Sequence, residues 1–182
     1  MNEILIATAS QTVGPFFHLA RNMDLGCVAR PGVPGERIRL TCRVFDGDGV
    51  PVPDALIELW QADANGIYGN PAFGGFGRLA SNENGVCIFE TVRPGRVAGQ
   101  DAALDNKTQA PHINLIVFAR GLLRHLYTRI YFSGDPANED DAVLAIIPIE
   151  RRATLIAQTA AQDAWNFEIH LCGDRETVFF DI

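Results

Sequence analysis

Residues 36–46 read ERIRLTCRVFD, in which polar and apolar side chains alternate from Arg37 to Val44. Side chains two residues apart lie on the same face of a β-strand, so this pattern predicts a strand with one buried face. The buried face would carry Ile38, Leu40, Cys42 and Val44, with arginines on the opposite face. The turn sequence Asp46-Gly47-Asp48-Gly49 follows at once.

Most of the remaining chain also predicts strands, separated by turn sequences. We expect further strands at 55–61, 86–92, 112–119, 126–132, 165–172 and 177–180. One segment, Ile149 to Ala161, predicts a helix because apolar residues recur at helical spacing after Pro148. Many short strands with little helix indicate a mainly β fold: an antiparallel β-sandwich with long functional loops and one or two short helices.

Length and composition are those of one globular domain over residues 1–182. The 182 residues are 47% hydrophobic, and the net charge of −7 argues against nucleic-acid binding. The short apolar run from Ile4 to Ala9 lacks a basic region before it, and no run approaches membrane-spanning length. We therefore expect a cytoplasmic protein. The four scattered cysteines (27, 42, 87 and 172) are expected to be reduced and structural.

Two long segments, 62–85 and 93–111, are rich in glycine, proline and small polar residues. Loops of this length inside a compact domain are usually functional or disordered. The second loop leads directly into Pro111-His112-Ile113-Asn114. In a strand, His112 and Asn114 would project side by side, and two histidines at that spacing would suit a transition metal. An asparagine amide is a poor ligand for such metals, so this chain has only half of that pair.

Several segments resemble the intradiol ring-cleaving dioxygenases, in order along essentially the whole chain. The segments shared with the family as a whole are Trp60–Tyr68, Phe76–Arg78, Arg93–Gly95, Pro111–Asn114 and Thr128–Phe132. Three more, Ser10–Phe16, Ala119–Gly121 and Glu176–Asp181, are similar to the non-iron-binding α chains of heteromeric members.

The resemblance implies non-haem Fe(III) held by two tyrosines and two histidines, all in a homologous partner, the iron-bearing β subunit. It also implies a small aromatic diol as substrate, whose ring opens between its two hydroxyl groups. In this chain Tyr68 and His112 match the first tyrosine and the first histidine. The second tyrosine position falls near Val97, and the second histidine is Asn114. We therefore expect no metal here, only a degenerate pseudo-site.

The resemblance further implies that part of this chain helps to form the partner's active site. Residues 1–20 would be an N-terminal arm from which Thr12, Gly14 and Pro15 contact the substrate region. Arg129 would attract a substrate carboxylate, or else form a structural ion pair. An arginine of the iron-bearing chains corresponds to Gln109 here.

Each candidate also has a purely structural interpretation. Tyr68 and His112 would then be half-buried or buried side chains with satisfied hydrogen bonds. His125 and His170 are expected on polar strand faces, and His18 near an interface. Three functions remain open: a non-catalytic subunit of a dioxygenase, a self-sufficient dioxygenase with unusual ligands, and a non-enzymatic transthyretin-like β-sandwich binding module.

Overall fold

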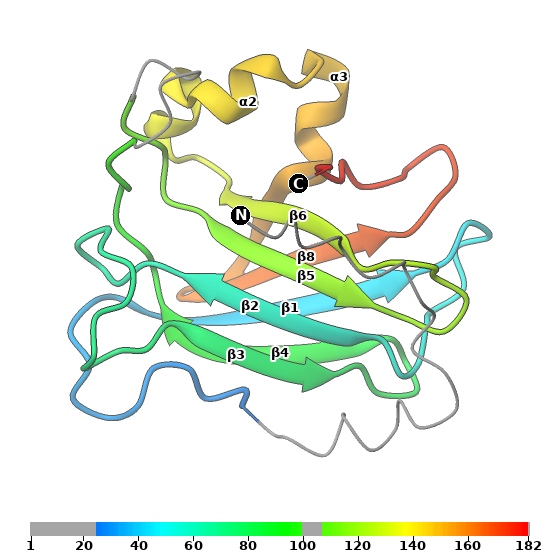
Figure 1. Ribbon diagram of the computed structural model, residues 1–182, viewed down its shortest axis with the longest axis horizontal. Helices are drawn as coiled ribbons and strands as arrows, with labels where there is room; N and C mark the ends of the chain where they lie inside the picture. The colour runs from blue at the N-terminus through cyan, green and yellow to red at the C-terminus, as the bar shows by residue number, and fades with distance from the viewer. Residues whose placement is uncertain (1–24, 100–106, 182) are drawn as a thin grey trace, which may run out of the picture.

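The structure is a computed structural model that describes residues 25–99 and 107–181. Within these residues, eight strands and four short helical segments follow one another (Figure 1). The strands are β1 (Arg37–Phe45), β2 (Leu56–Gln61), β3 (Phe76–Ala80), β4 (Val86–Val92), β5 (Ile113–Phe118), β6 (Leu126–Phe132), β7 (Ile156–Ala161) and β8 (Ala164–His170). The helical segments are η2 (Pro136–Asp140), α2 (Ala142–Ile146), α3 (Ile149–Arg152) and η3 (Ala153–Leu155).

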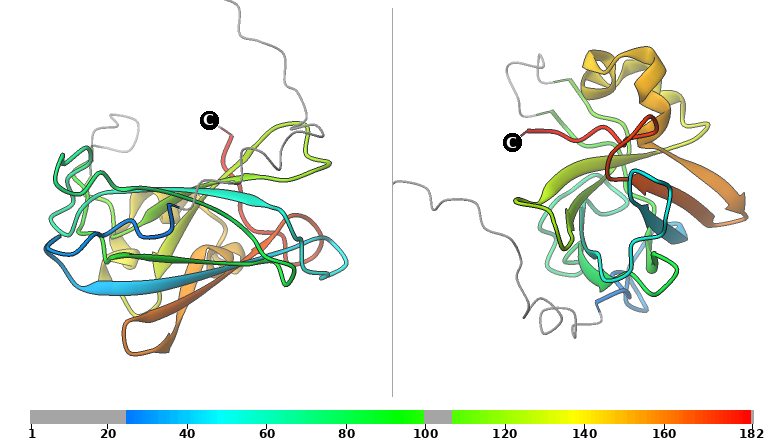
Figure 2. Two further views of the ribbon diagram at one scale, coloured as in Figure 1. Left: turned by 90° about the horizontal axis from the view of Figure 1, so that it is seen from below. Right: turned by 90° about the vertical axis from the view of Figure 1, so that its right-hand side faces the viewer.

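The strands form one continuous sheet in the order β3-β2-β5-β6-β7-β8-β1-β4. This sheet folds over on itself, which gives the two facing layers seen in Figure 2. The mainly β prediction is confirmed, but the purely antiparallel pairing is not. Strands β6 and β7 pair in parallel, as do β1 and β8, and the β6–β7 pair joins the two layers into a single sheet. The pairing of strands distant in sequence cannot be read from local alternation.

A short N-terminal segment lies between the two edge strands, β3 and β4. The backbone N–H of Leu25 donates to the carbonyl of Arg78 in β3 at 3.1 Å. Three residues later, the N–H of Val28 donates to the carbonyl of Glu90 in β4 at 2.9 Å. Residues 25–29 therefore hydrogen-bond to both free edges of the sheet.

The main core lies between the two layers, as the alternation in residues 36–46 predicts. Ile38 is 3% exposed, and Leu40, Cys42 and Val44 are fully buried. The facing layer contributes the inward side chains of β2, β5 and β6. Cys42 pairs across β1 and β4 with Cys87, and both thiols are free, as expected for structural cysteines.

The predicted helix over 149–161 is wrong in its second half. Helix α3 ends at Arg152, and residues 156–161 form strand β7. The apolar periodicity is misleading because Ile149 is 78% exposed, whereas Leu155 and Ala157 are fully buried. Pairing of β7 with both β6 and β8 outweighs the local helical pattern.

Two further strand predictions need correction. Strand β3 lies inside the segment expected to be a loop, because glycines break its apolar pattern. A side chain at Gly77 would approach Val28 to 2.7 Å, so the packing of the N-terminal segment requires glycine there. Conversely, residues 177–180 form no strand, and only Phe180 makes an isolated bridge, to Tyr127.

The short helices cover one end of the outer face of the β5–β6 pair (Figures 1 and 2). A second apolar cluster forms there around Tyr131, with Ala110, Ala137, Leu144, Ile147 and Leu155. None of the described helices is long and apolar enough to span a membrane. The described helices do not cover the other end of this outer face. The candidate site begins at the boundary between the covered end and the uncovered end.

Candidate functional site

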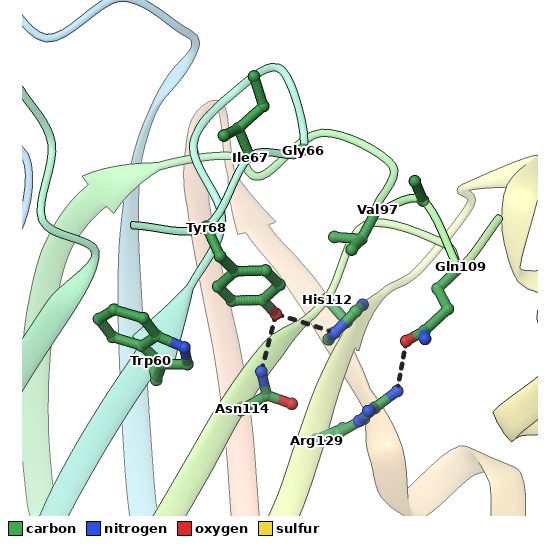
Figure 3. A pocket seen from close by; sticks show the side chains of 10 residues that line it. Trp60, Gly66, Ile67, Tyr68, Val97, Gln109, His112, Asn114 and Arg129 are labelled. Carbon is green, nitrogen blue, oxygen red and sulfur yellow. Dashed lines mark hydrogen bonds between the residues drawn. The ribbon is translucent and has the colours of Figure 1, made fainter. Parts of the chain in front are cut away.

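A cavity of about 690 Å³ opens at this boundary, where β5 begins. His112 immediately precedes β5 and Asn114 lies within it, and both point into the cavity, as the two-residue spacing predicts (Figure 3). Its lining consists of Trp60, Gly66, Ile67, Tyr68, Val97, Ala98, Gln109, His112, Asn114 and Arg129. The cavity thus contains all four pseudo-site positions expected from the sequence, together with Arg129.

The loop that carries Tyr68 is held by Asp63, whose pKa is lowered. Burial raises this pKa, but hydrogen bonds from Asn70 and from the backbone N–H groups of Ile67 and Asn65 outweigh it. Gly66 has a φ of 80°, and a side chain there would collide with the carbonyl of Arg96. The two long loops therefore contact each other closely next to the cavity.

The second loop is fixed at both of its ends. Val97 pairs with Gln109 through two backbone hydrogen bonds of 3.2 and 2.8 Å. At the start of the loop, Arg93 forms an ion pair with Asp135 at 2.8 Å and lies 4.6 Å from the ring centre of Phe132. These contacts place Val97 in the cavity wall opposite Arg129 (Figure 3).

The polar side chains of the cavity form one directed series of hydrogen bonds. The Tyr127 hydroxyl donates to Asn114 Oδ1 at 2.5 Å, and Asn114 Nδ2 donates to the Tyr68 hydroxyl at 2.8 Å. That hydroxyl lies 3.1 Å from His112 Nε2, and His112 Nδ1 lies 2.8 Å from the carbonyl of Ala110. A carbonyl can only accept, so Nδ1 carries the proton and Nε2 accepts from Tyr68. Each group in the series is neutral and has a partner.

Burial keeps the phenol and the imidazole in their neutral forms. It raises the pKa of Tyr68 above its usual value of 10, and the hydrogen bond from Asn114 only partly opposes it. It lowers the pKa of His112 to about 4, and the Arg129 charge acts in the same direction. At neutral pH, therefore, neither a phenolate nor an imidazolium forms in this series.

Among the described residues that line the cavity, Arg129 alone carries a formal charge. Its Nη1 donates to Gln109 Oε1 at 2.8 Å. None of the ion pairs among residues 25–99 and 107–181 includes Arg129. The buried carboxylate of Asp141 hydrogen-bonds instead to the Tyr131 hydroxyl and to the N–H groups of Ala110, Val143 and Leu144.

This set of side chains does not fit a ferric ion. One phenol and one imidazole are present where two of each are implied, and these two are hydrogen-bonded to each other. Asn114 offers a weak amide donor and Val97 offers none. A guanidinium in the same cavity would also repel a cation. The cavity is therefore built from neutral and cationic groups, the reverse of what a trivalent metal requires.

The other sequence candidates are not among the described residues that line the cavity. Thr12, Gly14, Pro15 and His18 are outside the described residues. His125 is exposed, whereas His170 is only 6% exposed and stacks on Phe45, although its strand face is otherwise polar.

Sequence reasoning missed Trp60 and Asp141. Trp60 stacks on Tyr68 in the cavity wall, with 5.9 Å between the ring centres. This contact depends on the conformation of the loop between the two residues. A sequence signal existed for Asp141, because an aspartate before Ala142-Val143-Leu144 is typical of a helix N-cap.

Comparison with known proteins gives a consistent family. A family model described as "Dioxygenase" matches residues 14–175. The protocatechuate 3,4-dioxygenase alpha chains of Pseudomonas putida and Burkholderia cepacia are 41% and 38% identical, covering 98% and 96% of this chain and 98% and 97% of theirs. The beta chain of the B. cepacia enzyme is 32% identical, over 82% of this chain and 66% of its own.

Solved structures share the fold. The dioxygenase domain of a dioxygenase–carbohydrate-binding fusion protein from Streptomyces sp. SirexAA-E superposes with a TM-score of 0.65 at 22% identity, covering 95% of this chain and 96% of that one. Together with the sequence matches, this shows that the chain belongs to the intradiol ring-cleavage dioxygenase family, with higher identity to the alpha chains of protocatechuate 3,4-dioxygenase than to the beta chain.

Proposed function

We propose that this chain is the alpha subunit of a heteromeric protocatechuate 3,4-dioxygenase. The enzyme would open the ring of 3,4-dihydroxybenzoate between the two hydroxylated carbons, and both atoms of O2 would enter 3-carboxy-cis,cis-muconate. This reaction belongs to aromatic catabolism through the β-ketoadipate pathway, in the cytoplasm. Non-haem Fe(III) held by a homologous beta subunit would supply the oxidation chemistry.

The observation that carries the proposal is the combination of family membership with a cavity that does not fit iron. The alpha-chain relatives match over nearly their whole lengths at 38–41% identity. Val97 and Asn114, which the resemblance sets at the positions of a phenolate and an imidazole ligand, line this cavity and offer neither group. Such a chain supports catalysis only if another chain provides the metal.

We further propose that the arm of residues 1–20 contributes Thr12, Gly14 and Pro15 to the substrate region of the beta subunit. Glycine permits close backbone approach, and proline restricts the backbone. Arg129 is proposed to attract the substrate carboxylate. Since its side chain lines the cavity of this chain, that role requires the cavity mouth to face the partner's site.

Co-expression with an iron-bearing beta-chain homologue tests the proposal. We expect the two chains to co-purify, with one iron per pair and O2 uptake on protocatechuate. The chain alone is expected to bind no stoichiometric ferric iron and to show no visible tyrosinate-to-iron absorption. Asn114→Ala serves as the control, because a change in this cavity should leave the iron content of the pair unaltered.

Arg129→Ala in the assembled enzyme tests the carboxylate contact. A charge-assisted contact contributes about 1.5–3 kcal/mol, so KM for protocatechuate should rise about ten- to a hundredfold and KM for catechol should change little. Equal effects on both substrates would contradict this role. An isolated chain that binds one iron and cleaves the ring would contradict the subunit assignment. A stable chain that does not bind the beta homologue would favour the binding module.

A further inference from the structure

Arg129 is a half-buried cation with polar neighbours but no carboxylate partner among the described residues. Its hydrogen-bond partners are neutral: Gln109 Oε1 accepts from Nη1, and the hydroxyls of Tyr127 and Tyr131 also hydrogen-bond to the guanidinium. A guanidinium has five donors in a planar fork that matches a carboxylate. A partly desolvated cation without a counter-ion is unfavourable, and an anion in the adjacent cavity would relieve this cost.

The remaining polar groups of the cavity offer little to compete with Arg129. Tyr68, His112 and Asn114 are engaged in the directed series of hydrogen bonds, which ends on the carbonyl of Ala110. The nearby carboxylate of Asp141 already accepts four hydrogen bonds from other groups. Among the lining residues that the structure describes, an entering anion would therefore meet one cation and no carboxylate.

The rest of the lining suits a flat apolar body. Trp60 and Tyr68 stack with their rings 22° apart on one side, and Ile67, Val97 and Ala98 supply aliphatic surface (Figure 3). The volume of about 690 Å³ is within the range of small-molecule sites, about 300–1,000 Å³. A single fixed charge beside a mainly apolar wall is the usual composition of a site for a small amphiphilic anion.

We propose that this cavity is a metal-independent binding site for a small aromatic carboxylate, with the carboxylate paired to Arg129 and the ring against the Trp60–Tyr68 side. This site lies in the chain itself and goes beyond the proposed subunit function, because it needs neither iron nor a partner. Arg129 would select an anion in a cavity where the iron-bearing relatives are expected to hold a metal cation.

Equilibrium dialysis of the full chain against benzoate, in buffer treated with a chelator, tests the proposal. We expect saturable binding of one benzoate per chain. Arg129→Met, which keeps much of the side-chain volume, should weaken binding about tenfold or more. The matched control is Arg124→Met, because Arg124 is an exposed arginine outside the cavity. Benzyl alcohol, the neutral analogue, should bind the native chain about as weakly as benzoate binds Arg129→Met.

Tryptophan fluorescence gives a second readout that does not depend on the stability of the Arg129 variant. The chain has only two tryptophans, and Trp165 is in the core. Benzoate should therefore change the emission of the native chain but not that of Trp60→Phe. Val97→Phe, which adds a ring to the cavity wall without altering its charge, should weaken binding. Unsaturable binding, or equal binding by the native chain, Arg129→Met and Val97→Phe, would overturn the proposal. It would leave the subunit function intact, since co-purification with a beta chain is measured separately.

Discussion

The side chains on the two faces of strand β5 have different roles. Ile113, Leu115 and Val117 point inward and are fully buried in the core between the layers. On the outer face, His112 just before the strand and Asn114 within it belong to a cavity whose residues no longer suit a metal. Because adjacent residues point in opposite directions, one face can keep the fold while the other loses its chemistry. A family fold is therefore no evidence for a family active site in the same chain.

The largest effect should come from the inner face. Leu115→Ala removes a fully buried side chain and leaves a hole in the core, which typically costs about 2–5 kcal/mol. Urea unfolding followed by circular dichroism would measure the loss. Ile116→Ala is the control on the outer face of the same strand, where the side chain is only partly buried. Equal losses for both variants would contradict the division between the two faces.

Asp141 connects the outer face to the helices that cover its far end. The carboxylate is fully buried and accepts hydrogen bonds from three backbone N–H groups and the Tyr131 hydroxyl. Asp141→Ala leaves these donors unpaired, and we expect unfolding to become easier by about 2–4 kcal/mol. Asp140→Ala, one residue earlier and exposed, should change stability by less than about 0.5 kcal/mol. Thermal unfolding of both variants provides the comparison, and similar melting temperatures would exclude the anchoring role.

The directed hydrogen bonds predict a stability that depends on pH through His112. Its pKa is about 4 in the folded chain against 6.5 ordinarily, so between these values the unfolded chain binds more protons. The contribution of the neutral imidazole is fully present above pH 6.5 and is lost as the pH falls towards 4, by up to about 3 kcal/mol. His112→Gln should reduce this pH dependence in urea unfolding at pH 7 and pH 4.5. His125→Gln, at an exposed histidine, should retain it; a His112→Gln profile parallel to that of the native chain would refute the assignment.

The smallest effect is expected at the hydroxyl of Tyr68. Tyr68→Phe removes the middle of the series and leaves Asn114 Nδ2 and His112 Nε2 without that partner. Water can reach the open cavity and replace part of the loss, so we expect about 1 kcal/mol. Tyr127→Phe, at the start of the series, takes a hydroxyl away from Asn114 and Arg129 but leaves the Tyr68–His112 hydrogen bond in place, so it should cost less. A larger loss for Tyr127→Phe would show that the series is not organised around Tyr68.

The sequence predicted best what depends on local alternation. Strand β1 and the side-by-side placement of His112 and Asn114 follow from side chains two residues apart, and both were predicted. Strand β7 was not predicted, because its conformation depends on pairing with β6 and β8. The contact between Arg129 and Gln109 was also not predicted. It joins a strand to a loop, and the position of that loop depends on the backbone pairing of Val97 with Gln109.

The four positions given by the resemblance line one cavity, but the resemblance could not predict how their side chains interact there. An arginine was expected at position 109 in iron-bearing chains, and here Gln109 accepts a hydrogen bond from Arg129 on the adjacent strand. A positive charge is thus present near that position, but it comes from a different element. Arg129 and Gln109 are not close in sequence, and only the three-dimensional arrangement shows that they are in contact.

The segment 25–29 has a consequence for the order of folding. Its hydrogen-bond partners, the backbone groups of Arg78 and Glu90, follow about fifty to sixty residues later in the chain. During synthesis this segment therefore leaves the ribosome long before either strand that it joins. Closing so long a loop costs conformational entropy before any contact is made, so we expect the segment to dock late, after both layers have formed. Until then the edges of β3 and β4 are unpaired, and exposed strand edges promote aggregation. Nascent chains that stall between synthesis of β4 and docking of this segment should be the species most dependent on chaperones.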